Sequence, residues 1–140
     1  MTRNASAVWN GGFKTGEGRL STGNGLLNGA PYSFKSRFED GEGTNPEEMI
    51  AAAHSGCYAM ALTAFLEQAG FAPESVSVTA QISMDTIDGA PTLTKSNLVT
   101  VASVPGIDDA KFQEIAADAK AKCPISRALN MEITLDAKLA

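Results

Sequence analysis

The N-terminal part of the chain alternates short apolar pieces with glycine-rich turns. The apolar pieces cover Ala5–Trp9, Gly18–Ser21 and Tyr32–Phe38, and the turns lie at residues 10–12 and 23–25. Short runs of this kind, separated by glycine and asparagine, are typical of strands joined by tight turns. We therefore expect strands with tight turns in this part of the chain.

The loop at residues 40–46 leads into a long helix with well-marked ends. Asn45 is suited to cap the helix, the proline after it fits the first helical position, and Glu48 stands where a capping box has its acidic residue. Gly70 marks the end, because glycine readily adopts the left-handed conformation that ends helices. The pattern predicts a helix from Pro46 to about residue 68.

Apolar residues follow one face of this predicted helix. Alanine, serine and glycine line much of it, so the backbone of a partner helix could come unusually close. We expect this stripe to be buried and the helix to be the core element of the fold. The stripe consists of Met49, Ala53, Cys57, Met60 and Ala64, widened by Ile50, Ala61 and Phe65.

Two segments after this helix alternate with a period of two residues. One runs over Val76–Met84 and the other over Leu98–Val104. The alternation predicts an antiparallel pair of strands. Pro105 and Gly106 then break the second strand.

A second helix is expected to begin at Asp108 and Asp109, where acidic side chains favour the helix dipole. Pro124 favours ending or kinking it, residues 125–129 could form a short turn, and Glu132–Leu139 alternates again as a final strand. The apolar stripe of this helix consists of Phe112, Ile115, Ala116, Ala119 and Cys123.

The order of these elements and the composition indicate one α+β domain. The chain has 140 residues, of which 44% are hydrophobic and 19% charged, as in an ordinary globular protein. We expect a single domain over residues 1–140, with N-terminal strands in 1–40, a central helix over about 46–69 and a second strand-helix-strand part in 74–140.

Charge and hydropathy narrow the possible partners. Eleven Lys and Arg against sixteen Asp and Glu give a formal net charge of -5, without a basic cluster, so a nucleic-acid partner is not expected. The N-terminus lacks the apolar stretch of a secretory signal, which predicts a cytoplasmic protein. The longest apolar stretch, Ile50–Leu66, is shorter than the roughly 20 residues that cross a bilayer, so we interpret it as a buried helix and expect no membrane contact.

The chain has two cysteines, Cys57 in the middle of the first helix and Cys123 at the end of the second. A free cysteine is most often a small buried hydrophobe, and two cysteines in a reducing compartment are too few to staple a fold. Both, however, lie on faces expected to be buried, so the two thiols can meet. Such a pair favours redox chemistry, with one peroxide-reactive thiol and one resolving thiol.

A peroxide-reactive cysteine needs a cation beside it. The thiolate is the efficient nucleophile, and at an unperturbed pKa of about 8.5 it makes up only a few per cent of the thiol at neutral pH. Arg37 is the leading candidate, because it ends an apolar stretch before the loop into the first helix. Arg127, four residues after Cys123, is a second candidate, while Arg3 and Arg19 sit among polar residues.

A carboxylate could orient this guanidinium through a bidentate pair. Capping explains Glu48, which leaves Glu47 free for such a role. Ten residues of helix, however, separate Glu47 from Cys57 by roughly 15 Å. Glu47 would therefore act on the thiol through an arginine or from a second subunit.

His54, three residues before Cys57, has two readings. It could be the base of a Cys-His pair, or a hydrogen-bonded structural residue, which is the more common role of a lone histidine in a helix. One histidine and two distant cysteines are a poor ligand set for zinc, so no metal site is expected.

Five segments carry a resemblance to a known family. They are Arg37–Glu39, Gly43–Glu48, Ala52–Cys57, Cys123–Ser126 and the closing Glu132–Asp136. Occurring together in this order, they make the sequence resemble the OsmC/Ohr family over essentially the whole chain.

The resemblance implies an OsmC-like fold of antiparallel sheets around a long central cysteine-bearing helix. It also implies an intertwined homodimer with two active sites at the interface. A site completed by the second subunit would resolve the distance between Glu47 and Cys57.

The resemblance further implies roles for individual residues. By matching motifs, Cys57 corresponds to the peroxidatic cysteine, Cys123 to the resolving cysteine, Arg37 to the activating guanidinium and Glu47 to the carboxylate that pairs with it. The two branches of the family place the arginine differently along the chain, and the residues around Arg37 match the OsmC pattern. Arg19 is the alternative.

The reaction implied by the resemblance is the reduction of an organic hydroperoxide to an alcohol. It would pass through a Cys57 sulfenic acid and a Cys57–Cys123 disulfide, without metal, haem or flavin. An external dithiol would be the reductant, and lipoyl groups on proteins are the form suggested by the Ohr branch. The alternative is a non-catalytic dimeric stress protein that binds an apolar small molecule or a partner.

Overall fold

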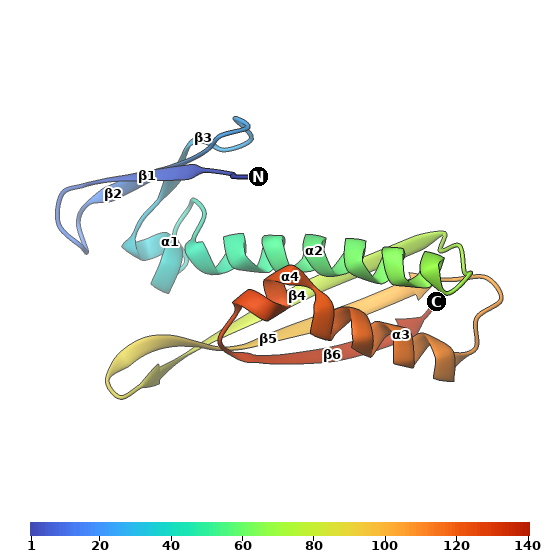
Figure 1. Cartoon of the computed structure of the whole chain (residues 1–140). Helices are drawn as coiled ribbons and strands as arrows, with labels where there is room; N and C mark the ends of the chain where they lie inside the picture. The colour runs from blue at the N-terminus through green and yellow to red at the C-terminus, as the bar shows by residue number, and fades with distance from the viewer. The chain divides into compact units, whose positions relative to one another are not determined.

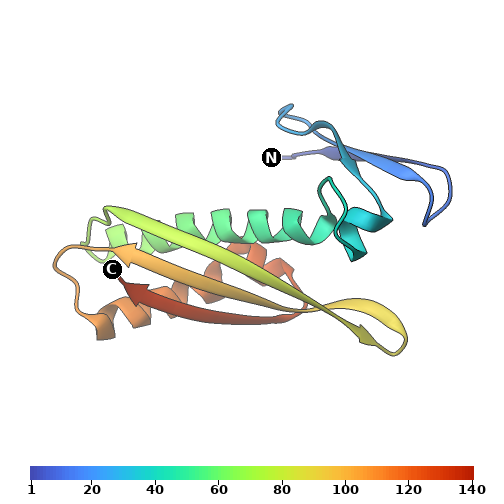
Figure 2. The same cartoon turned by 180° about the vertical axis from the view of Figure 1, so that it is seen from behind.

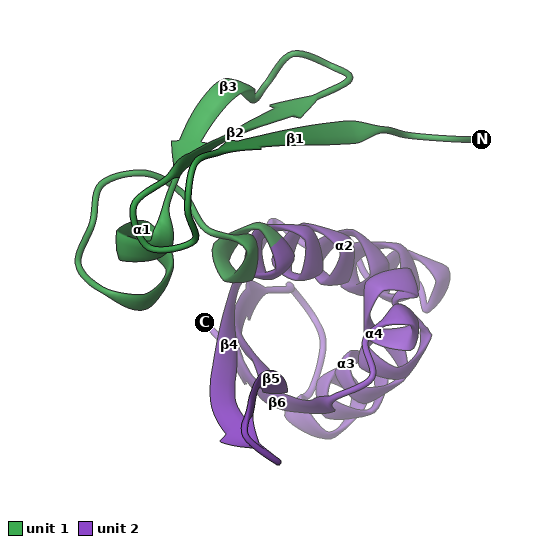
Figure 3. Ribbon diagram, turned by 90° about the vertical axis from the view of Figure 1, so that its left-hand side faces the viewer, with its two compact units in different colours: residues 1–49 green, residues 50–140 purple.

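The computed structural model describes all 140 residues and has the expected α+β architecture. It contains two three-stranded sheets, one formed by β1, β2 and β3 and the other by β4, β5 and β6 (Figure 1). The chain divides into two compact units, Met1–Met49 and Ile50–Ala140, which Figure 3 shows in green and purple. We refer to them as unit 1 and unit 2.

Unit 1 contains an antiparallel sheet formed by β1 (Ala5–Asn10), β2 (Glu17–Thr22) and β3 (Asn28–Tyr32). The predicted strand over Tyr32–Phe38 is wrong beyond its first residue, because α1 (Phe34–Phe38) follows. Ser33 starts this helix through a capping box with Ser36, in which each hydroxyl accepts a hydrogen bond from the other residue's backbone N–H.

The long helix α2 (Pro46–Gln68) begins and ends where the sequence predicts. The backbone N–H of Glu48 donates to Asn45 Oδ1 over 2.8 Å, which confirms the N-terminal cap. At the other end Gly70 has a positive φ of 90°, and the Phe71 N–H donates to the Leu66 carbonyl over 2.9 Å.

The face of α2 that is buried differs from the predicted stripe. His54, Tyr58, Leu62 and Leu66 are the buried residues, whereas Met60 of the predicted stripe is 76% exposed. Packing against α3 and the sheet of unit 2 selects this face, because Tyr58, Leu62 and Leu66 join the core formed with those elements.

The expectation that the apolar segment is too short to cross a bilayer is also wrong. The 23 residues of α2 are long and apolar enough by length and composition. One such helix is weak evidence for a membrane span, since the core helix of a soluble protein passes the same test.

The sheet of unit 2 is built from β4 (Ser75–Ile87), β5 (Ala90–Ser103) and β6 (Glu132–Leu139). The predicted antiparallel pairing of β4 with β5 is confirmed, and both strands extend to a two-residue Asp88-Gly89 turn with positive φ at both residues. One pairing departs from the expected antiparallel order, because β6 runs parallel to β5. The intervening helices return the chain to the same end of the sheet, as a parallel connection requires.

Two helices lie between β5 and β6, α3 (Asp109–Lys122) and α4 (Pro124–Ala128). Asp108 caps α3, since its Oδ1 accepts from the Lys111 N–H over 2.8 Å. Both views of the ribbon show α2 and α3 on the same face of the sheet of unit 2 (Figures 1 and 2).

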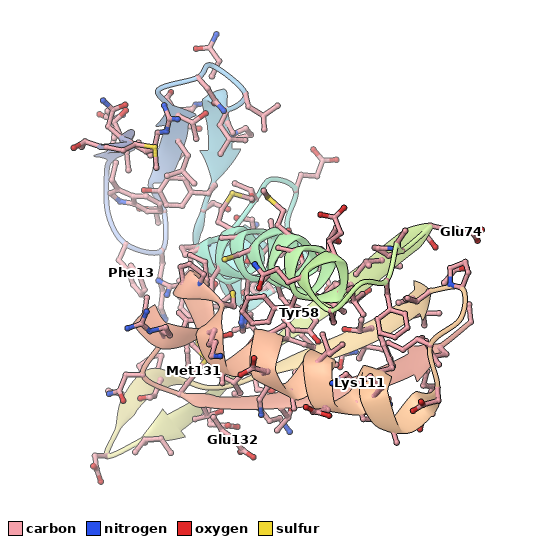
Figure 4. The ribbon with its side chains drawn as sticks, turned by 45° about the vertical axis from the view of Figure 1, so that its right-hand side comes forward. Phe13, Tyr58, Glu74, Lys111, Met131 and Glu132 are labelled. Carbon is pink, nitrogen blue, oxygen red and sulfur yellow. The ribbon has the colours of Figure 1, made fainter.

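The hydrophobic core lies between these helices and the sheet of unit 2. Tyr58 points from α2 toward α3 (Figure 4), and its hydroxyl donates to the Ala116 carbonyl over 3.1 Å. The expected stripe of α3 is confirmed as buried. The core consists of Tyr58, Leu62, Leu66, Leu98, Ala102, Val104, Phe112, Ile115, Ala116, Ala119, Cys123 and Ala137.

Candidate functional site

An ion pair in unit 1 joins the arginine and the carboxylate singled out in the sequence. Arg37 Nη2 and Nε donate to Glu47 Oε1 over 2.8 and 3.1 Å, and Nε also lies 3.4 Å from Oε2. The side chains are 36% and 14% exposed, respectively. This forked contact orients the plane of the guanidinium and leaves Nη1 free of Glu47.

The corner between α1 and α2 determines where this pair lies. Ser36 Oγ donates to the Thr44 carbonyl over 2.8 Å, and Asn45 Nδ2 donates to the Ser36 carbonyl over 3.2 Å. Gly43 has a φ of 114°, and a Cβ on it would lie 2.6 Å from the Pro31 carbonyl oxygen. Glycine is therefore required at this turn, and the hydrogen bonds hold Arg37 of α1 opposite the first turn of α2.

An aromatic cleft of about 400 Å³ lies beside Arg37 within unit 1. The guanidinium carbon is 5.1 Å from the centre of the Phe38 ring, a cation–π distance. The predicted strand over Tyr32–Phe38 would not form this cleft, whereas the helix α1 places Phe34 and Phe38, four residues apart, on one face. The cleft is lined by Trp9, Gly11, Phe13, Tyr32, Ser33, Phe34, Arg37 and Phe38.

The two cysteines meet within unit 2. Their Sγ atoms are 3.0 Å apart as two free thiols, close enough for one to hydrogen-bond to the other. Cys123 is completely buried, while Cys57 is partly exposed. A small movement would therefore bring the two sulfurs to bonding distance.

Cys123 occupies the junction between α3 and α4. Its N–H donates to the Ala119 carbonyl over 2.9 Å, and its carbonyl accepts from the Arg127 N–H over 3.0 Å. Its ψ of 126° is not helical, as expected for a residue before Pro124. The proline thus turns the chain at the point that presents the thiol to Cys57.

The surroundings shift the acidities of the two thiols in opposite directions. Burial, together with a hydrogen bond to Cys123, raises the pKa of Cys57. Burial also opposes ionisation of Cys123, but the backbone N–H groups of Ser126 and Ile125, the Cys57 thiol and the Ser126 hydroxyl lower its pKa overall. Nothing cationic in unit 2 contributes to either shift.

His54 is completely buried and bonds two serines. Its Nδ1 lies 2.7 Å from Ser96 Oγ of β5, and its Nε2 lies 2.7 Å from Ser126 Oγ of α4. Burial lowers the pKa of the imidazole, so the neutral form predominates at neutral pH. Both ring nitrogens are engaged by hydroxyls, which leaves neither of them to act directly as a base toward Cys57.

The other arginines considered from the sequence lie elsewhere. Arg19 is an exposed side chain of β2 whose Nη2 is 3.9 Å from Glu17 Oε2, and Arg127 is exposed on α4. Neither forms a bidentate pair like that of Arg37 with Glu47. No group of three or more His, Cys, Asp or Glu side chains is arranged to hold a metal ion.

Most of the chain matches a known protein family. Residues 39–138 match the family model described as OsmC-like protein. The chain belongs to the OsmC-like family. The resemblance seen in the sequence is thereby confirmed; the matched residues include Glu47 and both cysteines, while Arg37 lies just before them.

OsmC-like relatives of known name cover the chain well. Peroxiredoxin OsmC of Escherichia coli is 47% identical over 98% of this chain and 96% of its own length. An organic hydroperoxide resistance protein of Xanthomonas axonopodis pv. citri is 32% identical over 68% of this chain and 67% of its own. Kinship of this extent makes the chain an OsmC-like peroxidase.

Solved structures confirm the fold. The structure of the organic hydroperoxide resistance protein OhrB of Bacillus subtilis has a TM-score of 0.76 and 24% identity, covering 96% of this chain and 98% of that one. An OsmC-like protein from Mycoplasma pneumoniae has a TM-score of 0.78 at 14% identity, covering 100% and 98%. Sequences this different share the architecture because the same pattern of helices and sheets is kept.

Proposed function

We propose that this OsmC-like peroxidase reduces organic hydroperoxides to alcohols, with Cys57 as the peroxidatic cysteine and Cys123 as the resolving cysteine. The observation that carries the proposal is the 3.0 Å separation of the two sulfurs. In the first step the Cys57 thiolate attacks the terminal peroxide oxygen, the O–O bond breaks, and the alkoxide leaves as the alcohol after protonation. Cys123 then displaces the oxygen of the resulting sulfenic acid and forms a disulfide.

The assignment of the two cysteine roles rests on access. The pKa shifts alone would favour Cys123 as the cysteine that attacks the hydroperoxide, because the pKa of Cys123 is lowered and that of Cys57 is raised. Cys123 is completely buried, however, so a hydroperoxide cannot reach its sulfur, whereas Cys57 is partly exposed. Access therefore assigns the attack on the hydroperoxide to Cys57. The more acidic thiol, Cys123, is suited to attack the sulfenic acid in the second step.

Cys57 then needs a cation to overcome its raised pKa, and we propose Arg37 for this role. A guanidinium within about 4–6 Å would favour the thiolate and lower the pKa of Cys57. The forked contact with Glu47 supports this role, because it orients the guanidinium while one of its nitrogens stays free of that carboxylate. Glu47 would act on the thiol through Arg37.

We further propose a homodimer in which a second chain completes each site. Two observations support it. Unit 1 exposes large apolar side chains, including Val8 and Phe13 at 58% and 63%. The small-residue face of α2 is exposed as well, and Gly56 has nothing within 4 Å of where its Cβ would be. Exposed apolar surface of this kind marks association sites.

The disulfide would be reduced by an external dithiol, and lipoyl groups on proteins are the candidate class. A dithiol is suited to this step because its second thiol displaces the first from the mixed disulfide and closes a ring. The cycle uses only thiols, so we propose no metal, haem or flavin. A reducing cytoplasm is the compartment in which both cysteines would be returned to the free state.

One observation favours a second candidate function, the binding of an apolar small molecule or partner without catalysis. The aromatic cleft beside Arg37 is large enough for a small ligand and needs no thiol to bind one. The same cleft would also suit the organic part of a hydroperoxide. The two functions therefore differ in what they require of Cys57.

The decisive experiment measures hydroperoxide consumption by the parent protein and by Cys57→Ser. With cumene or tert-butyl hydroperoxide and a dithiol, we expect turnover by the parent and none by the variant. The matched control, Cys123→Ser, should reduce a first equivalent of hydroperoxide and leave a sulfenic or overoxidised Cys57, which intact-mass analysis would detect. Consumption by Cys57→Ser at the parent rate would contradict the proposed mechanism, whereas a parent protein without turnover would favour the binding function.

The proposed dimer has its own measurement. Sedimentation at micromolar concentration should give about twice the chain mass of 14.6 kDa. A mass equal to that of one chain would leave Arg37 without the proposed interface in which to act.

A further inference from the structure

A second link runs beside the sulfur pair in unit 2, and the cycle described above does not use it. His54 lies three residues before Cys57 on α2, and Ser126 lies three residues after Cys123 on α4. His54 Nε2 and Ser126 Oγ are 2.7 Å apart, while the two sulfurs are 3.0 Å apart. The same two segments are therefore joined twice, once by the sulfurs and once by the hydrogen bond.

Filling space in the core does not explain why a histidine stands at position 54. The ring is completely buried, and its second partner, Ser96 of β5, is completely buried too. Burying an imidazole and a hydroxyl is unfavourable unless every polar atom is paired, whereas an aliphatic side chain would fill the same space without that requirement. The two short hydrogen bonds meet the requirement and hold the ring from both sides.

The direction of the two hydrogen bonds depends on the tautomer of His54. A neutral imidazole donates from one nitrogen and accepts at the other. If the Ser96 hydroxyl donates to Nδ1, then Nε2–H donates to Ser126 Oγ, and the proton of the Ser126 hydroxyl is free for Cys123. This order agrees with the contribution of the Ser126 hydroxyl to the lowered pKa of Cys123. In the opposite tautomer the Ser126 hydroxyl would donate its proton to His54 Nε2 and could not donate to Cys123.

We propose that His54 is a positioning residue for the resolving step: its hydrogen bond to Ser126 holds the Cys123 segment against α2 and directs the Ser126 hydroxyl toward the Cys123 sulfur. The inference rests on the proposed function and concerns only its second step. There the Cys123 thiolate attacks the sulfur of the Cys57 sulfenic acid, an S–S bond forms and the S–O bond breaks. The departing hydroxide takes up the proton that Cys123 released and leaves as water.

The consequence for the enzyme is protection of Cys57. A sulfenic acid that waits for its partner thiol is exposed to a second hydroperoxide, which oxidises it irreversibly to the sulfinic acid. By keeping the attacking sulfur close and lowering the pKa of its thiol, the His54–Ser126 bridge favours the disulfide in this competition.

Three variants isolate the hydrogen bond between His54 and Ser126, and a fourth is the matched control. Ser126→Ala removes the hydroxyl, His54→Leu removes both hydrogen bonds, and His54→Gln keeps an N–H donor near the position of Nε2. The matched control is Ser103→Ala at the end of β5, which loses a hydroxyl that donates to Glu74 Oε2 over 2.9 Å at an exposed position.

The reaction is followed by rapid quenching and intact-mass analysis after mixing with cumene hydroperoxide. We expect sulfenic acid formation at the parent rate in all four variants. Disulfide formation should be slower by about tenfold in Ser126→Ala and His54→Leu, with more sulfinic acid, because the attacking thiolate is less populated and less well placed. His54→Gln should recover most of the parent rate, and Ser103→Ala should match the parent.

Two measurements on the reduced protein need no turnover. His54 is the single histidine of the chain, so the imidazole nitrogen chemical shifts report its tautomer directly, and we expect the proton on Nε2. In a Cys57→Ser background Cys123 is the single thiol, and adding Ser126→Ala should raise its pKa by about one unit.

A proton on Nδ1, or disulfide formation at the parent rate in a folded Ser126→Ala protein, would overturn the inference. If His54→Leu does not fold, the rate of disulfide formation in Ser126→Ala and the tautomer of His54 test the inference. A parent protein that consumes no hydroperoxide would instead contradict the proposed function, and the tautomer and the pKa of Cys123 would still decide the bridge.

Discussion

The two units of this chain hold their chemically important side chains in opposite surroundings. In unit 1, Arg37 and Glu47 form a charged pair at a polar, partly exposed corner. In unit 2, Cys57 and Cys123 meet at the edge of a hydrophobic core, beside a histidine that is completely buried. The contrast follows from solvation, because a charged pair is stable near water and a neutral thiol is stable in the core.

Under the proposed mechanism, neither unit alone would make an efficient peroxidase. Burial lets the two sulfurs approach, but it also raises the pKa of Cys57. The guanidinium that would counter this effect belongs to unit 1. We therefore propose that a reactive thiolate forms when the two kinds of surroundings are brought together in the homodimer.

The largest expected effect is a loss of stability on truncating a buried leucine, which tests the difference in apolar packing between the two units. Leu62→Ala removes a completely buried side chain from the core of unit 2, whereas Leu26→Ala alters a side chain of unit 1 that is 84% exposed. We expect Leu62→Ala to lower the free energy of unfolding by about 2–5 kcal/mol, because it leaves a cavity. Urea denaturation at equal protein concentration measures this change in the free energy of unfolding. Leu26→Ala is the control and should change it little.

An equal loss of stability in the two leucine variants would mean that Leu26 is buried in the assembled protein. That outcome would remove the contrast between the units and would support an interface over this part of unit 1.

The second effect concerns catalysis. Arg37→Met should lower kcat/KM for an organic hydroperoxide by about 100-fold, because loss of the cation leaves the pKa of Cys57 raised and its thiolate scarce. Since the thiolate forms as pH rises, the variant should regain rate at higher pH than the parent. A pH profile of kcat/KM measures both, and Arg19→Met, which alters an exposed arginine of β2, should follow the parent profile.

A parent-like profile for Arg37→Met would show that another group activates Cys57. The charged pair of unit 1 would then be structural, and the two units would not share one site.

The smallest expected effect is a loss of stability at the junction of α1 and α2, where Arg37 and Glu47 pair. Asn45→Ala removes the cap that accepts from the Glu48 N–H and the donor to the Ser36 carbonyl. We expect a loss of about 1 kcal/mol in the free energy of unfolding. Thermal unfolding monitored by circular dichroism measures it, with Asn130→Ala at an exposed position as the control. No change would mean that α2 begins independently of this cap.

Local signals in the sequence were sufficient for several elements. Asn45 and Gly70 predicted the limits of α2, and alternation predicted β6 over Glu132–Leu139. Ser33 is the local signal that was overlooked, because its capping box with Ser36 starts α1 within an apparently strand-like run.

The buried face of α2 could not be predicted in the same way. Alanine and other small residues occur all around this helix, so its periodicity does not single out one side. Packing against α3 and the sheet selects His54, Tyr58, Leu62 and Leu66. This selection depends on which surfaces meet, which is a property of the folded unit.

The residue types, the helix caps and the alternation of strands are local properties, and the sequence alone determined from them the α+β class and the candidate cysteines, arginine and carboxylate. The tertiary structure decided which of these meet. It brought Cys57 and Cys123 to 3.0 Å across 66 residues, and His54 to two serines that lie 42 and 72 residues away. The physical reason is that local patterns determine how each segment folds, whereas contacts between distant segments arise only when their apolar faces are buried together.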